Sequence, residues 1–239
     1  MEKQLETQVR IPAGGVVLDG DLAIPGGATG IVVFAHGSGS SRHSPRNRSV
    51  ARVIQEAGVG SLLFDLLTRE EESVDVFTRH LRFDIELLTA RLIEATRWLA
   101  GQEETLNLRV GYFGSSTGAA AALMAAARLG AMSGPMSGMD IGAVVSRGGR
   151  PDLAGDALQM VKAPTLLIVG GHDELVIELN QDAYARLRCE KELKIIPGAT
   201  HLFEEPGALE QVADLAAAWF KKRLQSLPAP RSAAGGARQ

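Results

Sequence analysis

The chain has 239 residues, of which 45% are hydrophobic and 22% charged, enough for a folded domain with a buried core. A formal net charge of −3 gives no basis for binding nucleic acid or an acidic membrane surface. The single cysteine, Cys189, excludes an intrachain disulfide and a cysteine metal cluster. No secretory signal and no membrane-spanning apolar run is found, so we expect a cytoplasmic protein whose partner is a small molecule.

Short apolar runs alternate with longer stretches of helical periodicity along the whole chain. We predict strands over residues 5–11, 16–23, 31–35, 61–64, 110–113, 143–146, 165–169 and 193–196. We predict helices over residues 48–57, 80–100, 117–129, 153–160, 178–187 and 206–224. This alternation predicts an α/β fold, with a mostly parallel sheet, an antiparallel N-terminal edge and helices on both faces. We expect residues 1–225 to form one domain and residues 226–239, rich in Pro, Ala, Gly and Ser, to be a disordered tail.

The strand at 110–113 is followed by Gly114-Ser115-Ser116-Thr117-Gly118 and then by a helix. This G-x-S-x-G pattern predicts a sharp strand-to-helix turn in which Ser116 is held exposed as a nucleophile. The flanking glycines remove side chains that would clash in so tight a turn. The alternative is a Gly-Ser turn that only starts a helix. Ser115 is not the candidate, because its spacing from the glycines does not match the pattern.

Two later strands each end in a residue that could complete a Ser-His-Asp arrangement, in the chain order that this turn predicts. Asp173 follows the strand at 165–169, and His201 follows the strand at 193–196. We expect His201 to act as the base for Ser116 and Asp173 to orient it. The alternatives are a helix N-cap for Asp173 and a solvated loop residue for His201. Weaker candidates for the acid are Glu174, Glu204, Glu205 and Asp65.

The loop after the strand at 31–35 reads His36-Gly37-Ser38-Gly39-Ser40. A developing oxyanion needs two backbone N–H donors, and we expect them from Ser38 and Thr117. We expect His36 to be a buried, hydrogen-bonded structural residue. A phosphate-binding loop is disfavoured because the G-K-[ST] ending is absent.

Two arginines, Arg147 and Arg150, follow the strand at 143–146, whose end should lie beside the site. They are candidates for binding an anionic group of the substrate, because guanidinium forks match carboxylate and phosphate. The alternative is a solvated rim, which we favour for Arg42 and Arg46. The short segment 147–164 leaves no room for a lid domain, so we expect an open site without metal or cofactor.

Taken together, these motifs resemble those of the dienelactone hydrolase-like branch of the α/β-hydrolase superfamily. The motifs that carry the resemblance are HGSGSSRHSPRN (36–47), GSSTG (114–118), SRGGRPDLAG (146–155), GGHD (170–173) and PGATHLFEEPG (197–207). The resemblance implies the α/β-hydrolase fold and hydrolase activity. True dienelactone hydrolases carry cysteine at the turn where this chain has Ser116, so dienelactone chemistry is not carried over.

From these residues we expect a serine hydrolase that cleaves carboxylic esters of small substrates through an acyl-serine intermediate. A thioesterase or an acyltransferase would use the same residues. A non-catalytic small-molecule-binding module on the same fold is a further alternative, since a fold alone does not establish function. The sequence leaves the oligomeric state open.

Overall fold

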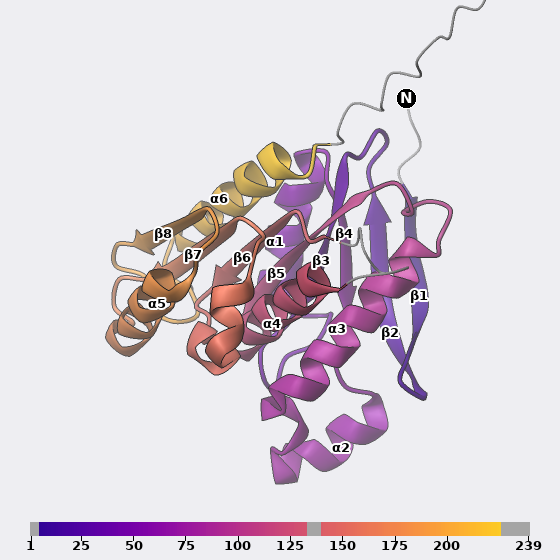
Figure 1. Ribbon diagram of the computed structural model, residues 1–239, viewed down its shortest axis with the longest axis horizontal. Helices are drawn as coiled ribbons and strands as arrows, with labels where there is room; N and C mark the ends of the chain where they lie inside the picture. The colour runs from indigo at the N-terminus through magenta and orange to yellow at the C-terminus, as the bar shows by residue number, and fades with distance from the viewer. Residues whose placement is uncertain (1–4, 133–139, 226–239) are drawn as a thin grey trace, which may run out of the picture.

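A single eight-stranded sheet organises the computed structural model, which describes residues 5–132 and 140–225 (Figure 1). The strands are β1 (Leu5–Ala13), β2 (Val16–Ile24), β3 (Gly30–Ala35), β4 (Gly60–Phe64), β5 (Arg109–Ser115), β6 (Ala143–Arg147), β7 (Thr165–Gly170) and β8 (Lys191–Ile196). Their order in the sheet is β1-β2-β4-β3-β5-β6-β7-β8. Strand β2 pairs antiparallel with β1 and β4, and the pairs from β4 to β8 are parallel. The predicted α/β class and its antiparallel N-terminal edge are confirmed. The predicted tail at 226–239 lies outside the described residues.

Strand burial follows from position in the sheet. Strands β3, β4, β6 and β7 are buried at every residue, and most of their residues are apolar, as in GIVVFA and TLLIVG. Parallel strands with helices on both faces have no solvated face, which explains the absence of polar alternation. The two outermost strands, β1 and β8, expose many of their residues, as expected for the edges of a sheet.

Helices cover the two faces of the sheet (Figure 1). They are α1 (Pro45–Glu56), α2 (Arg69–Thr78), α3 (Ile85–Ala100), α4 (Thr117–Ala131), α5 (Glu174–Arg186) and α6 (Ala208–Arg223), with 3₁₀ segments η1 (Leu81–Phe83) and η3 (Pro151–Met160). Helices α1 and α6 bury their apolar residues in one core cluster, and α3, α4 and α5 bury theirs in the other. Among the described residues no helix is long and apolar enough to cross a membrane.

Two helices begin earlier than the sequence pattern predicted. Helix α1 begins at Pro45 rather than at 48, because the Ser44 side chain accepts a hydrogen bond from the Asn47 N–H and proline fits the first helical position. Helix α5 begins at Glu174 rather than at 178, immediately after Asp173. Both early starts bring the helix N-terminus up to the carboxyl end of the sheet.

The segment between β4 and α3 differs most from the prediction, which had a single helix over 80–100. The segment forms the additional helix α2 and then η1. Helix α3 begins only at Ile85, where the side chain of the N-cap residue Asp84 accepts a hydrogen bond from the Leu87 N–H. Helix α2 begins in a capping box formed by Thr68 and Glu71. It buries the carboxylate of Asp75 and leaves Phe77 84% exposed. Because its apolar residues face outward, α2 lacks the amphipathic periodicity that would have indicated a helix.

The carboxylate of Glu71 ties α2 to α3. Arg91, which is buried on α3, donates to both oxygens of Glu71 at 2.6 and 2.5 Å and to the Leu66 carbonyl at 2.6 Å. Hydrogen bonds from Arg91 hold the pKa of Glu71 below its ordinary value of 4.5. A lowered folded-state pKa adds stability above about pH 4.5, and that stability is lost as the pH falls through the folded-state value.

Replacing Glu71 with Gln should therefore lower the free energy of unfolding at pH 7 by about 1–3 kcal/mol, because a buried arginine loses a charged partner. The difference from wild type should shrink as the pH is lowered below 4.5. Urea unfolding at pH 7 and pH 4 measures both effects. Glu70→Gln, at an exposed neighbouring position of α2, is the matched control. Equal stability of the two variants at pH 7 would contradict this role for Glu71.

Candidate active site

The direction in which successive strands are added to the sheet reverses between β3 and β5. Strand β3 lies between β4 and β5, so the connections that leave β3 and β5 run to opposite sides. Ligands of open α/β sheets bind at such a switch point. The loop of residues 36–40 follows β3, and Ser116 follows β5.

Ser116 has a strained backbone, with φ 50° and ψ −121°, at the N-cap of α4. The two glycines of the motif make this turn possible through close packing. A Cβ on Gly114 would lie 2.4 Å from the Ala119 Cα, and one on Gly118 would lie 2.1 Å from the Ala35 carbonyl oxygen. Neither position has room for a side chain. Strain of this kind costs about 1–3 kcal/mol and persists only where surrounding packing enforces it.

Asp173 and His201 meet above the ends of β7 and β8. The Nδ1 of His201 lies 2.6 Å from Oδ2 of Asp173. Asp173 occupies the N-cap position of α5, yet its side chain makes no capping hydrogen bond. The carboxylate therefore binds the imidazole in place of the helix amides. The side chain of His201 is 41% exposed, so a molecule in solvent can reach the imidazole. The side chain of Asp173, which lies behind it, is 16% exposed.

The loop after β6 joins Ser116 to His201. The Ser116 N–H donates to the Arg147 carbonyl at 3.3 Å. A Cβ on the next residue, Gly148, would lie 3.5 Å from Cε1 of His201. The same backbone therefore touches both candidate residues. Within the described residues, no hydrogen bond joins Ser116 Oγ to His201. Catalytic hydrogen bonds are often long in unliganded enzymes and shorten when substrate binds.

The two expected oxyanion donors lie next to each other. Thr117 is the first residue of α4, where backbone N–H groups have no acceptor within the helix. The N–H of Ser38 donates to the Thr117 hydroxyl at 3.1 Å. A Cβ on Gly37 would lie 3.1 Å from the Ser116 Cβ, so the loop passes directly over the nucleophile. A substrate oxygen would take the place of the Thr117 hydroxyl as acceptor for Ser38.

His36 is a structural residue, as expected. It is 8% exposed, its Nδ1–H donates to the Gly37 carbonyl at 2.9 Å, and its Nε2 accepts from the Leu66 N–H at 3.0 Å. An accepting Nε2 requires the neutral ring. Burial lowers the pKa of His36, which keeps it neutral. The ring thus connects the loop after β3 to the loop after β4.

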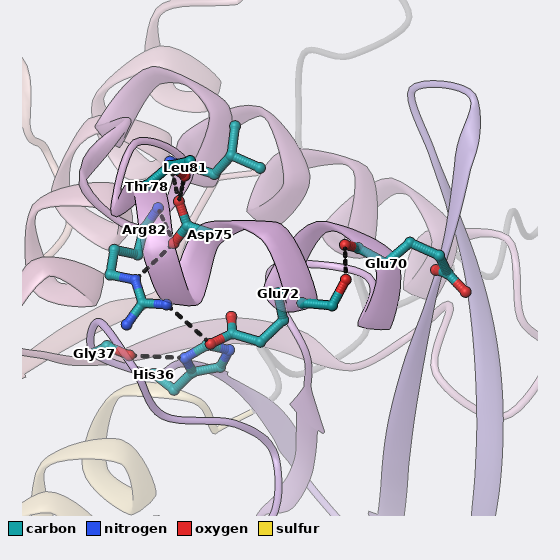
Figure 2. Close-up of polar contacts among 9 residues, drawn as sticks. His36, Gly37, Glu70, Glu72, Asp75, Thr78, Leu81 and Arg82 are labelled. Carbon is teal, nitrogen blue, oxygen red and sulfur yellow. Dashed lines mark hydrogen bonds and ion pairs between the residues drawn. The ribbon is translucent and has the colours of Figure 1, made fainter.

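The segment of α2 and η1 forms a wall beside this loop. Arg82 donates hydrogen bonds to the carboxylates of Asp75 at 2.6 Å and Glu72 at 3.1 Å. Figure 2 shows these three side chains on the α2–η1 segment, next to His36. A Cβ on Gly39 would lie 3.2 Å from Nη1 of Arg82. A cavity of about 810 Å³ opens between the loop and α2. One local pattern could have indicated this wall, the T-x-x-E capping box that begins at Thr68.

The weaker candidates for the acid have other partners or face solvent. Asp65 binds the Arg42 side chain and backbone, Glu204 binds Arg46, and Glu205 binds Thr200. Glu174 is exposed in the first turn of α5. Among the described residues only Asp173 places a carboxylate on His201.

The two arginines after β6 differ sharply. Arg150 is 39% exposed and donates to both oxygens of Asp152, at 2.9 and 2.7 Å. Arg147 is 7% exposed and lies over the Phe203 ring, 5.8 Å from its centroid. Burial, with a contribution from Arg46, lowers the pKa of Arg147 to about 10, so it stays charged at neutral pH. A role for either in substrate binding stays a prediction.

Comparison with known proteins identifies the family of this chain. Residues 18–227 match the model of the dienelactone hydrolase family. This chain belongs to that family. A crystal structure of dienelactone hydrolase from Anabaena variabilis ATCC 29413 superposes with a TM-score of 0.88 at 59% identity, covering 93% of this chain and 99% of that one. The dienelactone hydrolase family and the α/β-hydrolase fold, which the resemblance implied, are thereby confirmed.

Two further sets of relatives bear on this dienelactone hydrolase family member. Two proteins of Mycobacterium tuberculosis, named “Putative phosphoribosyl transferase” MT0597 and Rv0571c, are 59% identical over 219 residues. Those residues are 92% of this chain and 47% of each relative, so the chain spans about half their length. Est1E from Butyrivibrio proteoclasticus (TM-score 0.72, 16% identity, 90% of this chain, 98% of that one) shares the fold alone.

The single cysteine lies near the amino ends of β7 and β8, whereas Ser116 follows the carboxyl end of β5. The Sγ of Cys189 is 3.7 Å from the hydroxyl of Thr165, the first residue of β7. Burial raises the pKa of the Cys189 thiol, which disfavours the reactive thiolate. The nucleophilic cysteine of true dienelactone hydrolases therefore has no counterpart here, because the turn carries serine.

The strain at Ser116 predicts a gain in stability when its Cβ is removed. Ser116→Gly should raise the free energy of unfolding by about 1 kcal/mol relative to Ser116→Ala, because glycine adopts a positive φ without clash. Both variants lack the hydroxyl, so their difference isolates the backbone. Urea unfolding of the pair measures it. A glycine variant no more stable than the alanine variant would show that the turn is not strained.

Proposed function

We propose that this chain is a carboxylic-ester hydrolase that acts through an acyl intermediate on Ser116. The observation that carries the proposal is the 2.6 Å contact between Asp173 and His201, beside a serine held in a strained turn. Asp173 would accept a hydrogen bond from the Nδ1–H of His201, which leaves Nε2 of His201 as the basic nitrogen. Ser116 is half-buried at the N-terminus of α4, and the loop after β6 lies next to both Ser116 and His201.

In the proposed reaction, Ser116 Oγ attacks the ester carbonyl while Nε2 of His201 takes the hydroxyl proton. The tetrahedral intermediate collapses, the C–O bond to the alcohol breaks, and His201 returns the proton to the departing oxygen. Water, deprotonated by His201, then attacks the acyl-serine, and the acid leaves as Ser116 regains its proton. Asp173 fixes the tautomer of His201 and stabilises its charged form.

The developing oxyanion would bind the N–H groups of Thr117 and Ser38. The N–H of Ser38 already lies 3.1 Å from the Thr117 hydroxyl, so it points toward the start of α4. The substrate oxygen replaces that hydroxyl as acceptor, which keeps the donor hydrogen-bonded before and during the reaction. Loss of one such donor costs about 3–4 kcal/mol of transition-state stabilisation in serine hydrolases.

Two features support small substrates. The His201 side chain is 41% exposed, and the segment between β6 and β7 holds only η3. A thioesterase or an acyltransferase would share the acyl-serine, and the choice of acceptor distinguishes them. The relatives named as phosphoribosyl transferases are about twice as long as this chain, and we do not propose that activity for it.

A fluorophosphonate probe should label the protein at Ser116, seen as a mass shift on its peptide. Ser116→Ala should abolish labelling, and Asp173→Asn should lower kcat by about 10⁴-fold, because His201 would lose its tautomer. Glu174→Gln, the next residue and exposed, is the control and should keep wild-type turnover. Ester hydrolysis at the wild-type rate by Ser116→Ala would sink the mechanism, and a folded protein that neither labels nor hydrolyses would point to a non-catalytic module.

The open site predicts a preference for short acyl chains. Hydrolysis of p-nitrophenyl acetate and butyrate should exceed that of the palmitate ester in kcat/KM, because the segment between β6 and β7, described throughout, holds only η3 and supplies no lid for a long chain. Rates measured below and above the solubility limit of the substrate should show no interfacial jump. Preference for long-chain esters would instead mean that an apolar acyl tunnel exists.

A further inference from the structure

We propose that Asn180 of α5 is a positioning residue for the reaction at Ser116. Its buried amide ties α5 to the backbone segment of residues 147–150, which joins β6 to η3. This inference rests on the proposed function, since it concerns how Ser116 is aligned with His201. It is carried by a hydrogen bond from Asn180 to a segment whose backbone contacts both of these residues.

Asn180 occupies a position at which the pattern of α5 would place an apolar residue. The buried residues of α5 are Val176, Asn180 and Ala183, which have the spacing of one helix face. A fully buried amide costs free energy unless its groups are hydrogen-bonded. An apolar side chain would therefore serve better on a helix face that only packs. The partners of the amide indicate what it does.

The amide of Asn180 uses both of its hydrogens. Nδ2 donates to the Gly149 carbonyl at 3.1 Å and to the Val176 carbonyl at 2.7 Å. Because both neighbours are acceptors, only the NH₂ group can face them, and this fixes the orientation of the amide. The Oδ1 atom is buried and, among the described residues, has no hydrogen-bond partner. The side chain thus satisfies the Gly149 carbonyl and leaves its own acceptor unpaired.

The backbone at Gly149 is closely packed. Gly149 is buried, and a Cβ on it would lie 2.0 Å from Ser146 Oγ and 2.6 Å from the Ala119 Cβ. It therefore fits between the end of β6 and the first turn of α4. Without Asn180 its carbonyl would be buried and unpaired, which is costly. The backbone could then reach another donor or water only by shifting out of this position.

The segment of residues 147–150 binds Ser116 through both of its backbone groups. The Ser116 N–H donates to the Arg147 carbonyl at 3.3 Å, and the Arg150 N–H donates to the Ser116 carbonyl at 3.0 Å. Between these two contacts lies Gly148, whose φ is 50°. A Cβ on Gly148 would lie 3.1 Å from the His201 carbonyl oxygen and 3.5 Å from Cε1 of its ring. A shift of this segment would therefore move Ser116 relative to His201.

The helix that carries Asn180 also carries the candidate acid. Asp173 is the N-cap residue of α5, and Asn180 lies about two helical turns further along. The Asp173 carboxylate contacts His201, and the Asn180 amide holds the segment that binds Ser116. Helix α5 thus fixes the acid, the base and the nucleophile relative to one another. Asn180 acts through this alignment and not through contact with the substrate.

Two substitutions remove the bond to Gly149 in different ways. Leucine in Asn180→Leu has no donor, and the shorter serine of Asn180→Ser would bond the Val176 carbonyl one turn back instead. With p-nitrophenyl acetate, each variant should lower kcat by about tenfold to a hundredfold, because a misplaced base slows the chemistry. KM should stay within about twofold of the wild-type value, since no binding contact is lost. Labelling of Ser116 by a fluorophosphonate probe should slow by a similar factor.

Ser61→Ala is the matched control. Ser61 is fully buried near the amino end of β4 and accepts a hydrogen bond from Gln55 of α1 at 2.7 Å, so this variant also breaks a bond between a helix and the sheet. Its kcat, KM and labelling rate should equal those of wild type. The serine variant keeps a polar group at position 180 and carries the test if Asn180→Leu does not fold. Wild-type kcat and labelling rate in a folded variant at position 180 would overturn the inference.

Amide hydrogen exchange separates this inference from the proposed function. The Arg150 N–H, which is bonded to Ser116, should exchange at least about tenfold faster in Asn180→Ser than in wild type. The Gly142 N–H, which donates to Val110 at the amino ends of the strands, should exchange as in wild type. Unchanged exchange at Arg150, together with unchanged kcat, would overturn the role of Asn180 and leave the esterase intact. Faster exchange in a protein whose wild type neither hydrolyses esters nor reacts with the probe would overturn the esterase and leave Asn180 as the anchor of this segment.

Discussion

At Gly114 and Gly118 the backbone passes so close to its neighbours that a side chain on either residue would collide with another backbone atom. This packing brings the N-terminus of α4 against the end of β3 and holds Ser116 in its positive φ. The loop of residues 36–40 passes directly over Ser116. The rest of the candidate site depends on this contact, because it fixes both the candidate nucleophile, Ser116, and the loop that would bind the oxyanion.

Much of this arrangement could be predicted from the sequence because buried parallel strands and their loops leave clear patterns. Six of the eight strands follow from short apolar runs, and the first two follow from the Gly14-Gly15 turn between them. Asp173 and His201 follow from polar residues placed just after two of the strands. Helix α2 could not be predicted by periodicity, since it buries Asp75 and exposes Phe77. Its stability comes from hydrogen bonds to a buried carboxylate and from Arg91, which binds Glu71, and such pairings across sequence leave no local signal.

The arginines show a second limit of sequence reasoning. Arg147 and Arg150 read alike, since each follows the same strand beside glycine. Their environments differ because the Asp152 carboxylate is within reach of Arg150 alone, while Arg147 points to the opposite face toward α1. Arg46, favoured as a solvated rim residue, has a buried Nε. Burial of a charged side chain depends on which face of a strand it occupies and on what covers that face, and only the packed structure gives both.

Serine in place of cysteine changes what the rest of the site must do. A thiol ionises readily, so a thiolate nucleophile can exist before substrate arrives, whereas a serine hydroxyl must lose its proton during the attack. The base is then needed in the correct tautomer at each turnover. Here the carboxylate of Asp173 contacts Nδ1 of His201 and makes no capping hydrogen bond to α5. A helix cap contributes about 1 kcal/mol to stability, so its absence is a cost that a purely structural aspartate would not carry. In the proposed mechanism a hydroxyl nucleophile requires an imidazole held in this tautomer, and the Asp173 carboxylate makes that contact instead of capping α5.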